Sequence, residues 1–157
     1  MSAGEGPAAT PRPAGAATGH RRRRIARRAA IDVLYQSDIR DCTPSQAMAE
    51  WRAAGHAVPD YAADIVAGVE AGMRDIDRLL GESAEEWTVA RMVAVDRAIL
   101  RVAVYEMRTG LAPAVAVSEA VAAANELSTA DSGRFVNGVL GRVARTLGAD
   151  EPSTMER

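Results

Sequence analysis

The sequence contains no lysine, a single cysteine and few aromatic residues. Its 157 residues include 19 arginines, but Phe, Trp and Tyr together make up only 4%. Cys42 alone cannot form an internal disulfide, which excludes a disulfide scaffold. No apolar run approaches the length of a membrane-spanning helix, and residues 1–20 lack the apolar core of a signal peptide. We therefore expect a cytoplasmic protein.

Motifs of catalysis and of cofactor binding are also missing from the sequence. The two histidines, His20 and His56, are not spaced for a metal site or for a nucleophile and its base. The chain has no P-loop and no dinucleotide-binding glycine fingerprint. We expect a protein that is not an enzyme and that carries no metal or cofactor.

Helix-forming residues dominate what is present. The chain has 33 alanines besides its arginines, and both residue types rank high in helix propensity. The composition predicts an all-α fold of about six or seven helices in one compact domain. Residues 1–20 are rich in Ala, Gly, Pro and Thr without an apolar period, so we expect a disordered tail there. The folded domain is predicted over 21–148, followed by a frayed end at 149–157.

Several helix boundaries can be predicted from capping residues and helix breakers. Thr43-Pro44-Ser45-Gln46 has the pattern of a capping box, with Pro in the first turn, and Gly55 is a plausible stop. Pro59 opens a helix that we expect to continue to Gly81. A central core helix is predicted over 88–108, and Asp131 can cap a final helix that ends at Gly148.

The positive charge is concentrated at one end of the chain. Residues 1–30 hold seven arginines and one acidic residue, a charge of 7 − 1 = +6, so the rest of the chain carries −8. Six of these arginines form a cluster next to an apolar helical stripe: Arg21, Arg22, Arg23, Arg24, Arg27 and Arg28. Guanidinium groups match phosphate geometry with two parallel hydrogen bonds, so the cluster favours a nucleic-acid partner. The alternative is a solvated arm without a ligand.

Three blocks of sequence resemble one known family. They are DRAILRVAVYEM (96–107), AVSEAV (116–121) and DSGRFVNGVL (131–140). Together with the arginine-rich helix that runs into Leu34-Tyr35, they resemble the NusB family of transcription antitermination factors over about residues 21–146. The order and spacing of the blocks also fit.

The resemblance implies two packed helical bundles that bind RNA. Members of the family bind boxA, a short single-stranded RNA element, together with NusE, the ribosomal small-subunit protein ten. The complex joins RNA polymerase and other Nus factors and promotes read-through in ribosomal RNA operons. The resemblance leaves open a homodimer that masks the basic helix.

The family's RNA contacts map onto the six clustered arginines and onto Asp131, Ser132, Arg134 and Phe135. Tyr35 and Asp96 match positions that we associate with the protein partner. Some of these residues also have purely structural interpretations: Asp131 as a helix cap, Phe135 as core and Tyr35 as a half-buried residue of the first helix. Alternatives for the whole chain are the helical RNA-binding module of ribosomal RNA cytosine methyltransferases and a DNA-binding repressor.

Overall fold

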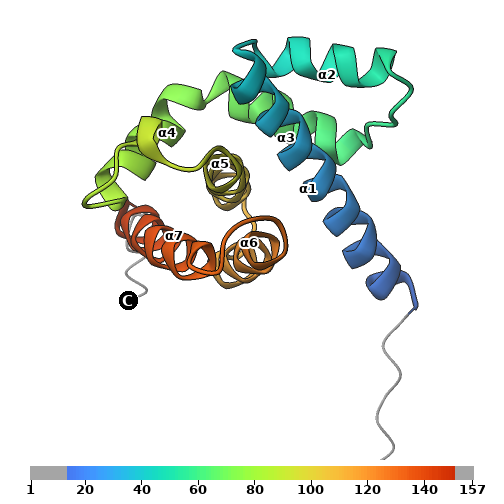
Figure 1. Cartoon of the computed structure of the whole chain (residues 1–157). Coiled ribbons are helices and arrows are strands. Elements are labelled where there is room, and N and C mark those ends of the chain that lie inside the picture. The colour runs from blue at the N-terminus through green and yellow to red at the C-terminus, as the bar shows by residue number, and fades with distance from the viewer. Residues whose placement is uncertain (1–13, 151–157) are drawn as a thin grey trace, which may run out of the picture.

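The structure, a computed structural model, describes residues 14–150 (Figure 1). Within this range it contains helices and no strand, as predicted. The helices are α1 (Ala14–Arg40), α2 (Pro44–Ala53), α3 (Asp60–Ala71), α4 (Met73–Ser83), α5 (Ala94–Arg108), α6 (Pro113–Leu127) and α7 (Ser132–Asp150), with a 3-10 turn, η1 (Val89–Arg91), before α5. No helix in the described range is long and apolar enough to cross a membrane.

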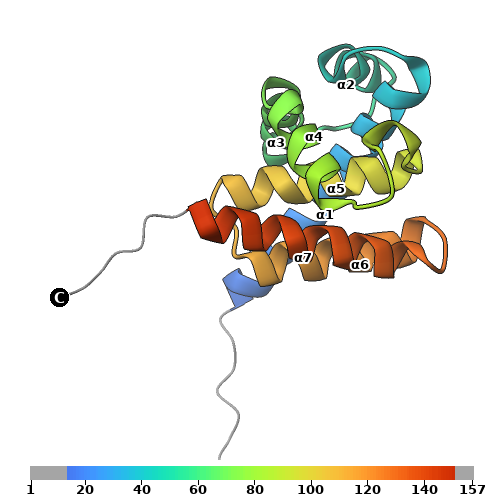
Figure 2. The same cartoon turned by 90° about the vertical axis from the view of Figure 1, so that its left-hand side faces the viewer.

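The helices form two bundles that share α5 as a common wall. Helices α1, α2 and α3 pack on one another, and α4, α5, α6 and α7 form the second group (Figures 1 and 2). Contacts of α1 and α3 with α5 join the groups. Helix α5 is buried around most of its circumference, which agrees with the apolar residues on several of its faces. The two-bundle architecture is confirmed.

The predicted capping box begins α2. Thr43 Oγ1 accepts from the Gln46 N–H at 3.2 Å, and the Gln46 side chain accepts from the Thr43 N–H at 3.0 Å. Gly55 and Gly110, which follow α2 and α5, have φ of 90° and 106°. Glycine is favoured at both positions because this left-handed region is costly for residues with a Cβ.

Several predicted helix boundaries were wrong. The central helix expected over 88–108 begins only at Ala94, after the 3-10 turn η1, because Met92 and Val93 have extended backbone conformations. Helix α1 begins at Ala14 rather than after residue 20, because the alanines before the arginines continue the same helix. Residues 1–13 of the expected tail lie outside the described range. The helix expected from Pro59 to Gly81 is divided at Gly72, and Gly81 lies inside α4. The bend turns Ile76 and Leu80 into the core.

The C-terminal boundary also differs from the prediction. Helix α7 continues past Gly148 and ends at Asp150, so residues 149 and 150, which we expected to be frayed, are helical. Residues 151–157 lie outside the described range.

An ionic network ties the two bundles together at the carboxyl end of α1. Asp38 accepts from Arg97 Nε at 2.8 Å and from Arg101 Nη1 at 3.1 Å. Arg101 also donates to both carboxylate oxygens of Asp77 in α4 at 2.9 Å. Burial lowers the pKa of Arg101, but the hydrogen bond and charge of Asp77 outweigh burial, and the net shift is upward. These contacts connect α1, α4 and α5.

A close helix contact generates the first prediction. A Cβ added to Gly68 in α3 would lie 2.0 Å from Cε2 of Tyr105 in α5, so Gly68→Ala should lower the free energy of unfolding by about 1–3 kcal/mol. Gly138, a helical glycine with open space around its Cβ position, is the control. Gly138→Ala should stabilise the protein by up to about 1 kcal/mol. Urea unfolding measures both, and equal effects would contradict the packing argument.

Candidate nucleic-acid interface

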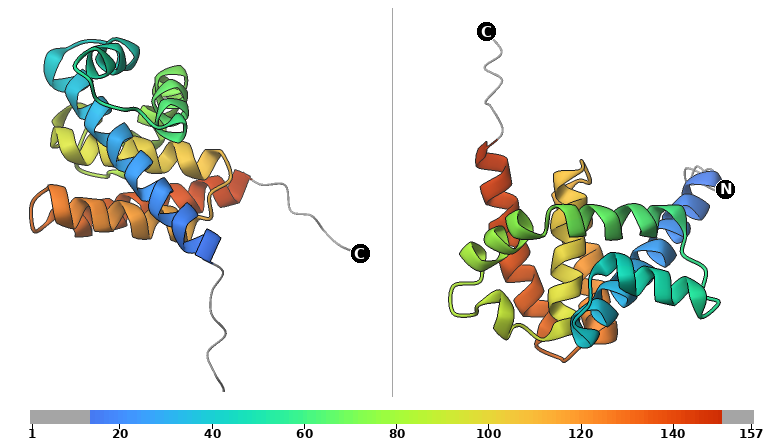
Figure 3. Two further views of the ribbon diagram at one scale, coloured as in Figure 1. Left: turned by 90° about the vertical axis from the view of Figure 1, so that its right-hand side faces the viewer. Right: turned by 90° about the horizontal axis from the view of Figure 1, so that it is seen from above.

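The six clustered arginines of α1 lie in three different environments. Arg21 to Arg24 are exposed, Arg28 is half-buried and Arg27 is only 7% exposed. Helical geometry explains the division, because residues 24, 27 and 28 share the side of the helix that turns toward α5 and α6. The amino end of α1 extends beyond the rest of the helices (Figure 3).

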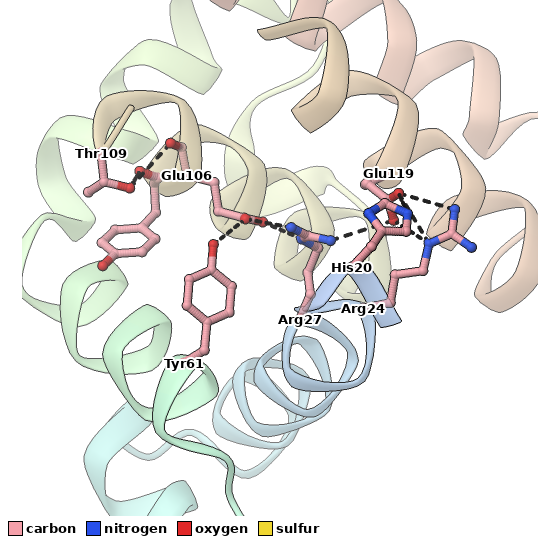
Figure 4. A network of polar contacts seen from close by, with 8 residues as sticks. His20, Arg24, Arg27, Tyr61, Glu106, Thr109 and Glu119 are labelled. Atoms are coloured by element: carbon pink, nitrogen blue, oxygen red, sulfur yellow. Dashed lines mark hydrogen bonds and ion pairs between the residues drawn. The ribbon is translucent and has the colours of Figure 1, made fainter. Parts of the chain in front are cut away.

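Arg27 forms a buried ion pair with Glu106 of α5. Arg27 Nε lies 2.5 Å from Glu106 Oε1, Nη2 lies 2.8 Å from Oε2, and the Tyr61 hydroxyl donates to the same Oε2 at 2.7 Å (Figure 4). Burial lowers the pKa of Arg27, but the hydrogen bond and charge of Glu106 outweigh burial and raise it overall. Burial and the hydrogen bond to Glu106 raise the pKa of Tyr61 to about 12. Arg27, predicted as an RNA contact, is therefore a structural residue that holds α1 against α5.

A second carboxylate, Glu119 of α6, faces the same part of α1. Arg24 Nε lies 3.1 Å from both Glu119 carboxylate oxygens, and Arg24 Nη2 donates to Oε1 at 3.1 Å. Arg27 Nη1 and His20 Nε2 each lie 3.5 Å from Glu119 (Figure 4). Arg24 is thus exposed but engaged within the protein.

Arg28 is also engaged within the protein. Its Nη1 lies 3.1 Å from Glu126 of α6, and its Nε lies 3.8 Å from Asp32. Burial raises the pKa of Asp32 despite the nearby Arg28 charge, which lowers it.

Three of the six arginines remain available. Arg21, Arg22 and Arg23 make no ion pair with the side chains of residues 19–148, which the structure describes. The Arg23 guanidinium carbon lies 5.9 Å from the centroid of the Tyr61 ring. The three side chains project from the amino-terminal half of α1 with an uncompensated charge of +3.

The start of α7 is built around Asp96, which is only 4% exposed. Its two carboxylate oxygens accept from Ser128 Oγ at 2.7 Å and from Ser132 Oγ at 3.0 Å. Asp96 and Ser132, predicted as partner and RNA contacts, therefore engage each other inside the protein. Two hydroxyl donors satisfy the hydrogen-bonding capacity of the buried carboxylate and join α5 to the turn before α7.

Asp131, Arg134 and Phe135 lie at the surface near this cluster. Asp131 directly precedes α7 and is exposed. No backbone N–H of the described residues donates to its carboxylate, so the predicted side-chain cap is not formed. Arg134 is exposed, and Phe135 is half-buried. Tyr35 is half-buried against the core, on α1.

Phe135 lines a hollow between the start of α7 and the segment that carries η1. The hollow is also lined by Trp87, Arg91, Met92 and Val93. Trp87 is 52% exposed and Val93 53%, so two large apolar side chains face solvent beside Phe135. These residues were not predicted from the sequence. The signal that could have indicated them is Trp87, a tryptophan just before a core helix in a chain with few aromatic residues. No cluster of three potential metal ligands occurs within residues 14–150.

The buried ion pair generates a prediction that separates structural from exposed arginines. Arg27→Met leaves Glu106 buried with only Tyr61 as a partner and should cost about 3–5 kcal/mol of unfolding free energy. Arg22→Gln, at an exposed position of the same helix, should change it by less than about 0.5 kcal/mol. Thermal and urea unfolding provide the measurement. A small loss in Arg27→Met would mean that the pair does not hold α1.

The Asp96 cluster generates a third stability prediction. Ser132→Ala removes one of two hydroxyl donors from a buried carboxylate and should cost about 1–3 kcal/mol. Asp131→Ala, one residue earlier, should have little effect because the Asp131 carboxylate accepts no backbone hydrogen bond that the substitution could remove. A larger loss of unfolding free energy at Asp131 than at Ser132, measured in urea, would show that the predicted cap is formed.

Comparison with known proteins places this chain in a family. Residues 24–145 match the NusB family. The transcription antitermination protein NusB of Saccharopolyspora erythraea is 47% identical over 128 residues, covering 78% of this chain and 86% of the relative. The protein of the same name from Acidothermus cellulolyticus is 46% identical over 121 residues, covering 75% and 83%.

Solved structures agree with the sequence relatives. A structure described as "T. maritima NusB, P3121, Form 2" superposes with a TM-score of 0.68 at 30% identity, covering 78% of this chain and 90% of that chain. A crystal structure described as antitermination factors NusB and NusE in complex with dsRNA gives a TM-score of 0.70 at 26% identity, covering 80% and 98%. The chain therefore belongs to the NusB family, a family of transcription antitermination proteins and not of enzymes.

Proposed function

We propose that this protein binds boxA-type single-stranded RNA together with NusE, the ribosomal small-subunit protein ten. The bound pair then joins RNA polymerase and other Nus factors and promotes read-through in ribosomal RNA operons. The observation that carries the proposal is the group of three exposed arginines, Arg21, Arg22 and Arg23, without acidic partners among the described residues. The solved structure described as NusB and NusE in complex with dsRNA supports NusE and RNA as partners. The choice of a single strand rests on the resemblance to the family.

The free arginines supply affinity for the RNA backbone. Repulsion among these like charges destabilises the amino-terminal half of α1, and a phosphate chain relieves it. Each guanidinium can grip a phosphate through two hydrogen bonds. The contacts proposed for this part of the RNA are therefore Arg21, Arg22 and Arg23, while Arg24, Arg27 and Arg28 hold the helix in place.

The hollow at the start of α7 supplies the contact with bases. Phe135 and Trp87 line the hollow with aromatic rings on which unstacked bases can stack, and this favours single-stranded over duplex RNA. Arg134 and Arg91 provide positive charge beside the rings. Asp131 borders the same path, and the Asp96 cluster fixes the position of the helix that carries Phe135.

The two regions can belong to one RNA path because both lie along α6. Glu119, which holds Arg24, is in the second turn of α6, and Glu126, which contacts Arg28, is next to the turn that leads to α7. The RNA would run from the amino end of α1 toward Phe135 over a distance of about 20 Å, the length of α6.

The protein partner would dock beside this RNA path. Tyr35 on α1 offers a half-buried ring with a polar hydroxyl, a side-chain type enriched at interfaces. Asp96 would contribute to binding of the protein partner indirectly, since its carboxylate already accepts hydrogen bonds from Ser128 and Ser132. A homodimer that covers the same basic helix would compete with both partners.

Salt dependence of RNA binding tests the proposal. Each phosphate neutralised on a single strand contributes about −0.7 to the slope of log K against log[salt], so three arginines predict a slope near −2. A boxA-like single strand should bind more tightly in the presence of NusE. Phe135→Ala should weaken binding by about 1–3 kcal/mol, and Arg22→Gln should reduce the slope by about 0.7.

Competitors of the same length complete this test. Scrambled single-stranded RNA, duplex RNA and duplex DNA should all compete less well than the boxA-like strand. A slope near zero, or a preference for duplex DNA, would overturn the proposal.

A further inference from the structure

Glu119 occupies the position that a phosphate would take on Arg24. Both of its oxygens lie 3.1 Å from Arg24 Nε, and Arg24 Nη2 donates to the same carboxylate. The Glu119 side chain is only 11% exposed, whereas that of Arg24 is 58% exposed. The carboxylate is therefore held by the protein, and the guanidinium reaches across to it.

The fold does not need Glu119 in order to neutralise Arg27. Arg27 already has a buried counter-ion in Glu106, with two hydrogen bonds of 2.5 and 2.8 Å, and approaches Glu119 only at 3.5 Å. The additional role of Glu119 is to bind Arg24, and His20 Nε2 lies 3.5 Å from the same carboxylate (Figure 4). Glu126, two turns further along α6, makes a single contact with Arg28 at 3.1 Å from a more exposed position. The groove between α1 and α6 is thus lined by arginines that already have partners.

We propose that Glu119 is a specificity-determining residue, which withholds Arg24 from the phosphate backbone and so limits binding of RNA that lacks the preferred bases. This inference rests on the proposed function. A phosphate entering the groove must break the bidentate contact and then lie beside a carboxylate of the same sign. RNA therefore gains backbone contacts only from Arg21 to Arg23, and further affinity has to come from bases that fit the hollow at Phe135.

The proposal is tested by releasing Arg24. Glu119→Gln keeps the shape of the side chain but removes its charge. It should raise affinity for a non-cognate strand such as oligouridylate several-fold and make the salt slope steeper by about 0.7, the contribution of one further arginine. Affinity for the boxA-like strand should rise less, so the ratio between the two strands should fall. A fluorescence titration with both strands at several salt concentrations measures all three quantities.

Glu50→Gln is the matched control. It removes the same charge and releases Arg40, another arginine of α1, but about 24 Å along the helix from Arg24. Affinity and slope should stay at the values of the unmodified protein. An equal gain in both variants would show a general charge effect and overturn the proposal.

Arg24→Gln tests the proposal in an otherwise unchanged protein. Because Arg24 is already engaged, this variant should bind RNA with an unchanged slope, whereas Arg22→Gln should lose about 0.7. Combined with Glu119→Gln, Arg24→Gln should cancel the gain. A loss of slope in Arg24→Gln alone would overturn the proposal.

The two proposals fail in different ways. No gain in Glu119→Gln, with RNA binding of the unmodified protein intact, would overturn the role of Glu119 and leave the proposed function standing. A flat salt response in the unmodified protein would overturn the proposed function itself.

Discussion

The buried pair between Arg27 and Glu106 determines what the rest of the arginine-rich helix can do. A charged pair this deep is tolerated because Nε and Nη2 of Arg27 donate to both carboxylate oxygens of Glu106, and Tyr61 donates a further hydrogen bond to the carboxylate. The pair fixes both the position of α1 on α5 and its rotation about its own axis. That rotation turns Arg24 and Arg28 toward the carboxylates of α6 and leaves Arg21, Arg22 and Arg23 toward solvent. Six arginines that are equivalent in the sequence therefore become three kinds of residue.

The helical fold could be predicted because its signals are local. The Thr43 capping box and the glycines that end α2 and α5 act within a few residues, and they appear where the sequence placed them. The division at Gly72 could not be predicted, because one apolar period runs through α3 and α4 without interruption. The bend there is determined by packing of α4 on α5 and α7, which are distant in sequence.

In the candidate site, too, contacts between residues that are distant in sequence could not be predicted. The sequence identified the arginine cluster and the start of α7, but it treated Arg27, Asp96 and Ser132 as surface contacts. Each has its partner in another helix, more than 30 residues away along the chain. The hollow at Phe135 was missed because Trp87 lies just before the predicted helix 88–108 and Val93 was expected inside it, whereas α5 begins only at Ala94. Residue type indicates which chemistry is available, whereas burial determines which residues can offer it to a ligand.

The position of Arg27 within α1 has a mechanical consequence. Arg27 is the central residue of a helix of 27 residues, about 40 Å long. The free arginines lie toward one end, and Asp38, near the other end, holds Arg97, whose Nη1 donates to the carbonyls of Val89 at 3.1 Å and Met92 at 3.2 Å. These carbonyls belong to the segment that lines the hollow at Phe135. Helix α1 is thus one continuous element that carries the free arginines near one end and, through Asp38 and Arg97, supports the rim of the hollow near the other.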